Sequence, residues 1–89
     1  MKLNLYAVFD SVAGMHLTPF VAQNHGVAVR SFGDQCGNPN SPFHIHPDNY
    51  ILFHIGTYDL QSARVENCER AERLGTAMDF KPVLPMVQQ

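Results

Sequence analysis

Residues 50–58 have the sequence YILFHIGTY, in which aromatic and β-branched side chains dominate. Such side chains fit the pleated, half-buried surface of a sheet, and only Gly56 opposes the assignment. Residues 59–62 then supply a turn, and residues 63–65 begin a return strand. The stretch therefore predicts a β-hairpin, and the other elements are placed around it.

Two segments near the N-terminus are also predicted to be strands. Residues 15–21 are expected to form a short antiparallel return strand, and Pro19 confines it to a sheet edge because proline cannot donate to a ladder. Residues 3–9 show the period of two that is typical of a strand. One face of that strand would carry Leu3, Leu5, Ala7 and Phe9, and the other Asn4, Tyr6 and Val8.

Two helices are predicted. The first begins at the N-cap Asn24, continues to about Cys36, and is closed by Gly37 in the left-handed conformation. The second follows Asn67, a capable N-cap, and covers residues 69–78. Its apolar face would consist of Ala71, Leu74 and Met78, and Glu69 and Arg73 would form a favourable i,i+4 pair.

The remaining segments are expected to be irregular. Residues 38–49 contain three prolines and are predicted to be mainly loop, and residues 82–89 are predicted to be a fraying tail. The order of elements predicts an α+β fold, with a small antiparallel sheet and two helices packed on one of its faces. All 89 residues would form a single domain.

Composition limits the partners of such a small domain. A core of this size is marginal, and 45% hydrophobic against 16% charged residues favours a homodimer. The net charge of −2 disfavours tight, non-specific binding of nucleic acid. Because the N-terminus lacks the apolar run of a signal peptide and no stretch could span a membrane, we expect a cytoplasmic protein without a membrane partner. Its two cysteines, Cys36 and Cys68, are expected to be reduced.

The sequence contains no recognisable catalytic motif. His44 and His46 lie two apart in an extended stretch and could approach one ion, but the ligand spacings typical of zinc sites are missing, and ordinary loop histidines are expected. His54 is expected to be a packed histidine of the strand. Cys68, near a predicted helix start, is the better placed of the two thiols, but nothing else supports a catalytic dyad. We therefore predict neither an enzyme nor a bound metal or cofactor.

Basic and aromatic residues offer a possible nucleic-acid surface. Single-stranded nucleic acid is bound where cationic groups alternate with exposed rings. The candidates are Arg30, Arg64, Arg70, Arg73 and Lys81, with Tyr50, Tyr58 and Phe43 as stacking surfaces. The alternative is that Arg70 and Arg73 pair with Glu66, Glu69 and Glu72 on a solvated helix, and that the aromatic residues belong to the core.

Several blocks of the chain resemble a known family. They are KLNLYAVFDSVAG at residues 2–14, Pro19-Phe20, residues 24–32 with Ala28, Arg30 and Phe32, Asn40-Ser41-Pro42, and LFHIGTYD at residues 52–59. In order and spacing they resemble the small nonstructural protein of gokushovirus-type microviruses, which are single-stranded-DNA phages. The resemblance implies a role in replication or packaging of the viral DNA inside the bacterial host. Arg30 lies within a matching block and is the leading candidate for a functional residue.

Two functions follow as hypotheses. In the first, a homodimer binds single-stranded viral DNA during replication or packaging. In the second, the protein docks on a viral or host replication or packaging protein and does not contact DNA. The resemblance favours the first, and the net charge favours the second.

Overall fold

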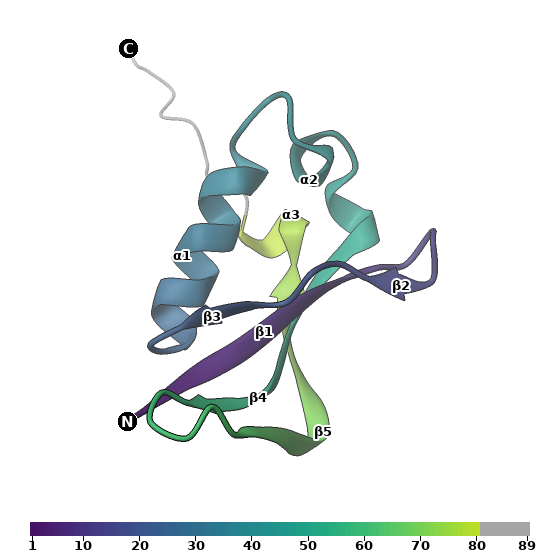
Figure 1. Ribbon diagram of the computed structural model, residues 1–89. Coiled ribbons are helices and arrows are strands. Elements are labelled where there is room, and N and C mark those ends of the chain that lie inside the picture. The colour runs from purple at the N-terminus through teal and green to yellow at the C-terminus, as the bar shows by residue number, and fades with distance from the viewer. Residues whose placement is uncertain (81–89) are drawn as a thin grey trace.

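Strand β1 (Lys2–Asp10) is the centre of a five-stranded antiparallel sheet in the computed structural model, which describes residues 1–80 (Figure 1). On one side β1 pairs with β4 (Tyr50–Asp59), and β4 pairs in turn with β5 (Val65–Thr76). On its other side β1 pairs with two short strands, β2 (Met15–His16) and β3 (Phe20–Ala22). The predicted hairpin and first strand are thus confirmed, and the predicted strand at residues 15–21 is divided in two.

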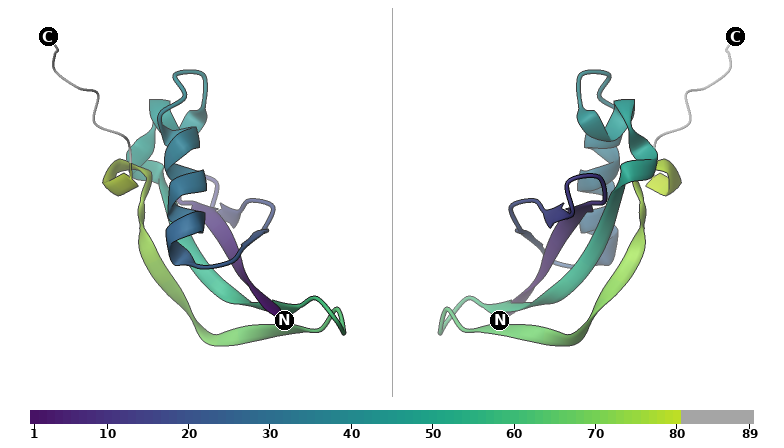
Figure 2. Two further views of the ribbon diagram at one scale, coloured as in Figure 1. Left: turned by 90° about the vertical axis from the view of Figure 1, so that its left-hand side faces the viewer. Right: turned by 90° about the vertical axis from the view of Figure 1, so that its right-hand side faces the viewer.

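One face of the sheet is covered by α1 (His25–Cys36), which crosses it diagonally (Figures 1 and 2). Three shorter helical segments lie at one end of α1: α2 (Pro42–Ile45), the 3₁₀ turn η1 (Pro47–Asn49) and α3 (Ala77–Phe80). The predicted loop at residues 38–49 therefore contains two short helices. Ser41 begins the first of them, because its Oγ accepts a hydrogen bond of 3.1 Å from the Phe43 N–H.

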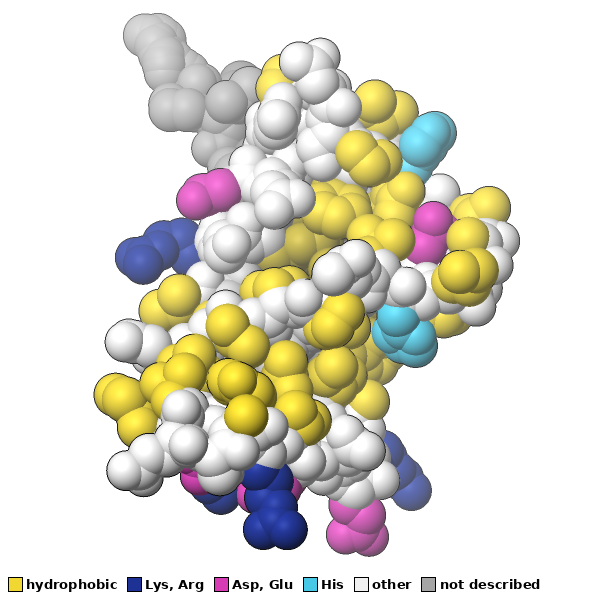
Figure 3. All heavy atoms as spheres, viewed as in Figure 1, with side chains coloured by type: hydrophobic (Ala, Val, Ile, Leu, Met, Phe, Trp, Pro, Cys, Tyr) yellow, Lys and Arg dark blue, Asp and Glu magenta, His cyan; other side chains and the backbone are white. Residues whose placement is uncertain are grey.

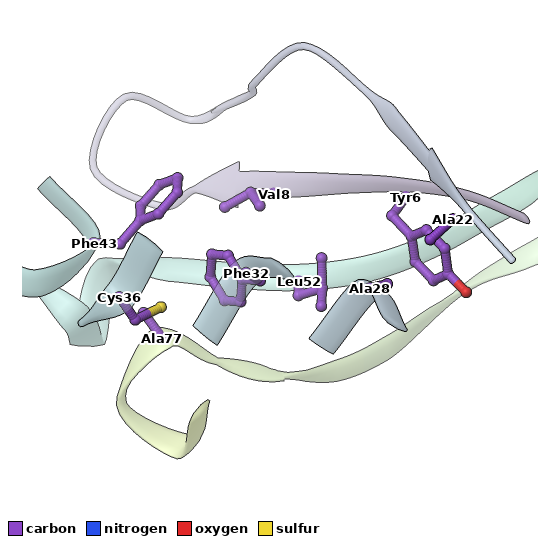
Figure 4. Packing of buried hydrophobic residues seen from close by; sticks show 9 residues of the cluster. All are labelled: Tyr6, Val8, Ala22, Ala28, Phe32, Cys36, Phe43, Leu52 and Ala77. Atoms are coloured by element: carbon purple, nitrogen blue, oxygen red, sulfur yellow. The ribbon is translucent and has the colours of Figure 1, made fainter. Parts of the chain in front are cut away.

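The hydrophobic core fills the space between α1 and the sheet (Figure 4). Its strand residues are the alternate positions that face the helix, and Tyr6 and Leu52 are completely buried there. The face of β1 that was predicted to carry Asn4, Tyr6 and Val8 is therefore the one that meets the helix. The buried cluster consists of Tyr6, Val8, Ala22, Ala28, Phe32, Cys36, Phe43, Leu52 and Ala77.

The limits of α1 agree with the sequence, but its C-terminal cap does not. Asn24 Oδ1 accepts a hydrogen bond of 2.9 Å from the Val27 N–H, as expected of an N-cap. Gly37 follows the last helical residue, yet its φ of −82° is right-handed and its N–H continues the helical pattern to the Gly33 carbonyl. The predicted left-handed cap at Gly37 is therefore wrong.

The predicted helix over residues 69–78 is also wrong. These residues belong mainly to β5, and only the four residues of α3 are helical in this region. Pairing with β4 on both sides of a bulge, at residues 65–67 and 72–76, holds β5 in the sheet, and this tertiary constraint overrides the modest helical preference of the segment. The arrangement of two helices on one face is not reproduced as predicted, because α1 is the only helix of more than one turn in the described residues.

Strand β5 is strongly bent. Its register with β4 shifts between His54 and Gly56, so that a bulge of β5 lies opposite Ile55 (Figure 2). Gly56 is required beside the bulge, because a Cβ there would overlap the Glu66 carbonyl oxygen. No helix of the described part of the chain is long and apolar enough to cross a membrane. The predicted tail at residues 82–89 lies outside the described residues.

The turn between β4 and β5 is organised by Asp59. Its Oδ1 accepts hydrogen bonds from the Gln61 N–H at 2.8 Å and the Ser62 N–H at 3.3 Å. These two bonds, in that order of importance, hold the pKa of the Asp59 carboxyl below its ordinary value of 3.8. Ala63 then adopts a positive φ of 61°, and Arg64 accepts a hydrogen bond from the Asp59 N–H.

We predict that Asp59→Asn reduces the acid sensitivity of the fold. A carboxyl whose pKa is lowered on folding stabilises the protein above its unfolded pKa, and this contribution is lost as pH falls through the folded value. Urea titrations at neutral pH and below about pH 4 should show a smaller loss of stability in the variant than in the parent protein. Asp34→Asn, on the exposed surface of α1, is the control and should keep the parental acid response.

We also predict that Leu52→Ala lowers the free energy of unfolding by about 2–5 kcal/mol, because it leaves a cavity under α1. Leu60→Ala makes the same change at a side chain that is 50% exposed, and should cost less than about 0.5 kcal/mol. Chemical denaturation of both variants measures the difference, and equal losses would contradict the described core.

Candidate functional site

The predicted basic residues do not gather into one patch. Arg30 lies exposed on α1, one helical turn before Asp34, on the side turned away from the core. Arg64 is exposed at the β4–β5 turn. Figure 3 shows Lys and Arg side chains in two separate places, beside α1 and along the end formed by the hairpin, with acidic side chains near both. Lys81 lies outside the described residues.

Glutamates and arginines alternate along residues 69–73 of β5. Arg70 and Arg73 are both exposed and follow Glu69 and Glu72 directly in the chain. Within residues 1–80, the ion pairs of the β5 glutamates are made with other partners: Lys2 Nζ lies 3.0 Å from Glu66 Oε1, and Glu72 lies beside two histidines. The predicted pairing of these arginines with neighbouring glutamates on a helix is therefore not what the structure shows.

The two candidate tyrosines have different environments. Tyr50 packs edge-on against Phe43, with ring centroids 4.8 Å apart, and both belong to the core region under α1. Tyr58 pairs in register with Leu3 and Val65, so these three side chains share the opposite face of the sheet. Of the predicted stacking residues, only Tyr58 is on that face.

That opposite face, here called the open sheet face, is not covered by a helix in the described structure (Figure 2, right). It is apolar and partly aromatic. The His16 ring lies against Phe9 and Phe53, with centroid distances of 4.7 and 6.2 Å. Arg73 stands directly opposite Phe53 in the ladder and brings a positive charge to this surface. The strand register places on it Leu3, Leu5, Ala7, Phe9, His16, Val21, Ile51, Phe53, Tyr58, Val65 and Arg73.

A polar cluster lies on the helix-covered face, where α1 begins. Tyr6 Oη is 2.8 Å from His25 Nδ1, and the rings of His25 and His54 are 4.7 Å apart. Glu72 Oε1 lies 3.4 Å from His25 Nε2 and 3.7 Å from His54 Nδ1. Burial and then the nearby Glu72 carboxylate raise the pKa of Tyr6 above its ordinary value, so its phenol stays neutral.

Other histidines have separate surroundings. His44 Nδ1 lies 2.9 Å from the Cys36 carbonyl, to which it donates, and so it caps the last turn of α1. His46 is exposed in the same segment. In the described part of the chain, the side chains that come close enough to share an ion are His25, His54 and Glu72 rather than His44 and His46.

Sequence comparison supplies the biological setting. The model of the family described as "Phage ORF5 protein" matches residues 3–80, which include all of the strands and helices described above apart from Lys2, the first residue of β1. The chain belongs to the phage ORF5 protein family. No curated protein and no solved structure matches it. The predicted resemblance is therefore confirmed as far as a phage protein family.

The family match covers the residues of both surfaces, but it gives neither of them a function. The open sheet face and the His25–His54–Glu72 cluster are built from elements inside the matched range. Sequence reasoning included Tyr58 and Arg73 of the open sheet face among its candidates, but it did not consider His25 or assign Glu72 to a site. No local motif could have revealed these two, because they lie on different elements, 47 residues apart in the chain.

Proposed function

We propose that this phage ORF5 family protein acts in the replication or packaging of the single-stranded DNA of a gokushovirus-type microvirus by binding that DNA on the open sheet face. The observation that supports the proposal is the group of rings on that face, Phe9, His16, Phe53 and Tyr58, with Arg73 among them. An antiparallel sheet presents such rings to one side at regular spacing. Bases of any sequence can stack on them.

The chemistry of the face predicts the character of the binding. Stacking of one base on an aromatic side chain contributes about 1–3 kcal/mol. Phosphate contacts would be few, because within residues 1–80 Arg73 is the only basic residue that the strand register places on this face, and Arg30 lies on α1 across the sheet. We therefore expect modest affinity with a shallow salt dependence, and binding dominated by the bases rather than by the phosphates.

We predict that Phe53→Leu weakens binding of a fluorescent oligothymidine by about fivefold or more, because leucine keeps the apolar volume and removes the stacking ring. Arg73→Ala should weaken binding and reduce the slope of log K against log salt by about 0.7, the value for one lost phosphate contact. Fluorescence anisotropy at several salt concentrations measures both effects.

Arg30→Ala is the matched control, because it removes the same charge from the outer surface of α1. It should leave both affinity and salt slope unchanged. An effect of Arg30→Ala equal to that of Arg73→Ala would move the DNA to the helix, as the sequence resemblance suggests. Undetectable binding of the parent protein at low salt would remove DNA as the ligand.

A second candidate function, docking on a viral or host replication or packaging protein, is favoured by a different surface. An apolar groove of about 560 Å³ separates residues 17–21 from α1 and is lined in part by Val8, Phe20, Phe32 and Phe43. Figure 3 shows an apolar hollow on this side of the molecule. Leu17, which is 40% exposed, is one of the residues that line it. Such a groove can hold an apolar side chain of a protein partner. The basic residues of the described chain are dispersed among acidic ones, and such a surface is better suited to a protein partner than to DNA.

Homodimerisation is part of the first candidate function, and the surfaces of the described structure differ in how well they suit it. The apolar side of α1 is used by the core, and β5 is an exposed edge that is bent and rich in charge, which opposes edge pairing. The outer edges of β2 and β3 remain, and β3 is the longer of these two strands, with Val21 46% exposed.

We predict that light scattering gives about twice the 10.0 kDa mass of one chain. Val21→Lys should lower this mass toward that of the monomer, because a lysine on an edge strand opposes pairing with a second strand. Val12→Lys, at a turn residue that is 77% exposed, should not. A monomer over a wide range of concentrations would contradict the homodimer.

A further inference from the structure

His25, His54 and Glu72 meet at the start of α1 from three separate elements. His25 is the first residue of α1, His54 lies in β4, and Glu72 is its register partner in β5. One donor atom of each lies within 4.8 Å of the others. Cys68, in the bulged part of β5, adds a thiol whose Sγ is 3.6 Å from His54 Nδ1. Two imidazoles, a carboxylate and a thiol are all ligands that zinc accepts.

The distances within this group fit ligands of one ion better than hydrogen bonds. Donor atoms about 2.0–2.3 Å from a tetrahedral zinc ion lie about 3.3–3.8 Å from one another. Glu72 Oε1 is 3.4 Å from His25 Nε2 and 3.7 Å from His54 Nδ1. Both separations are longer than the roughly 2.7–3.2 Å that is usual between the heavy atoms of an N–H···O hydrogen bond. Both fall within the range of distances between two ligand atoms of one zinc ion. Cys68 Sγ is 3.6 Å from His54 Nδ1, which is an ordinary distance for a hydrogen bond that involves sulfur. Cys68 is outside the group of three residues whose donor atoms lie within 4.8 Å of one another, so its thiol reaches a shared ion only after a shift of its side chain.

The hydrogen bonds of His54 fix its tautomer, and they leave the Nδ1 lone pair available to bind an ion. Asn4 Nδ2 donates to the Gln23 carbonyl at 3.0 Å, which sets the orientation of the Asn4 amide. Asn4 Oδ1 then faces His54 Nε2 at 3.0 Å, and because this oxygen can only accept, Nε2 must carry the proton. The lone pair of neutral His54 is therefore on Nδ1, which is the atom directed at Glu72 and Cys68.

His25 has a similar support on its other nitrogen. Its Nδ1 is 2.8 Å from the Tyr6 hydroxyl, whose oxygen can accept a hydrogen bond from an Nδ1–H. In that tautomer the lone pair is on Nε2, the atom nearest Glu72. Histidines that bind metals commonly donate their second N–H to a neighbouring oxygen in this way. The His54 side chain is 13% exposed, whereas His25 and Glu72 are 43% and 58% exposed, so an ion can enter from solvent.

We propose that His25 Nε2, His54 Nδ1 and the Glu72 carboxylate bind one Zn²⁺ ion, with the Cys68 thiolate as the fourth ligand. Two neutral imidazoles, one carboxylate and one thiolate carry two negative charges, which balance the charge of the ion. The ion joins the start of α1 to the middle of the sheet and to its outer strand, and so acts as a structural cross-link in a small domain. The site lies on the helix-covered face, so this inference is independent of DNA binding on the open sheet face.

The proposal is tested with the whole chain and Zn²⁺ alone. Titration calorimetry and elemental analysis of the loaded protein should give one zinc per chain, and excess zinc should raise Tm by about 5 °C or more over chelator-treated protein. Glu72→Gln should weaken zinc binding at least about tenfold. Because Glu72 is exposed, its variant is expected to fold, and the Tm of the zinc-free variant checks this. Failure to bind stoichiometric zinc, with an unchanged Tm, would overturn the proposal.

Two control variants locate the ion. Glu69→Gln removes the same charge from the same strand, and His46→Gln removes an exposed histidine of the loop. Both should bind zinc as the parent protein does. Loss of binding in His46→Gln without loss in Glu72→Gln would place the ion at His44 and His46 and refute this site.

Cobalt substitution tests the fourth ligand. A Co²⁺-loaded protein should show the charge-transfer absorption of a cobalt–thiolate bond, and Cys68→Ser should lose it while retaining one bound ion. An identical spectrum in Cys68→Ser, or none of this absorption in the parent protein, would remove Cys68 from the ligand set.

Discussion

The backbone ladder of β4 with its two neighbours is the interaction on which the rest of the structure depends. β4 pairs along most of its length with β1 on one side and β5 on the other, and Leu52, the third residue of β4, is completely buried under α1. This ladder satisfies the backbone groups of a chain that has little other regular structure, since α1 is the only long helix of residues 1–80. It also decides which side chains each face of the sheet presents.

The strand state of residues 65–76 has direct consequences for both candidate sites. Glu72 and Arg73 are adjacent in the chain, and in a strand adjacent side chains point to opposite faces. Glu72 therefore reaches His25 and His54 beneath α1, whereas Arg73 stands beside Phe53 on the open sheet face. In the predicted helix neither contact would exist. One error of secondary structure thus concealed both surfaces.

The two faces differ in what the chain itself supplies to cover them. The helix-covered face is closed by α1 and carries its polar side chains in hydrogen bonds, such as Tyr6 with His25 and Asn4 with His54. The open sheet face carries apolar and aromatic side chains, and no described helix lies over it. An apolar sheet surface of this kind is typical of a face that meets a ligand or a partner. This contrast supports a binding role for a phage ORF5 family protein.

The sequence by itself determined the strands that contain β1 and β4, the hairpin, and the helix that begins at Asn24, because alternation, β-branched residues and a capping side chain act locally. It could not determine the state of residues 69–78, because a helical pattern there competed with pairing to β4, and that pairing is not visible in the local sequence. Nor could the sequence decide which face of β1 is buried. One face carries Tyr6 and Val8, and the other carries four apolar residues, Leu3, Leu5, Ala7 and Phe9. The meeting of His25, His54 and Glu72 was decided by tertiary structure alone, because strand register and helix docking, rather than spacing along the chain, bring these side chains together.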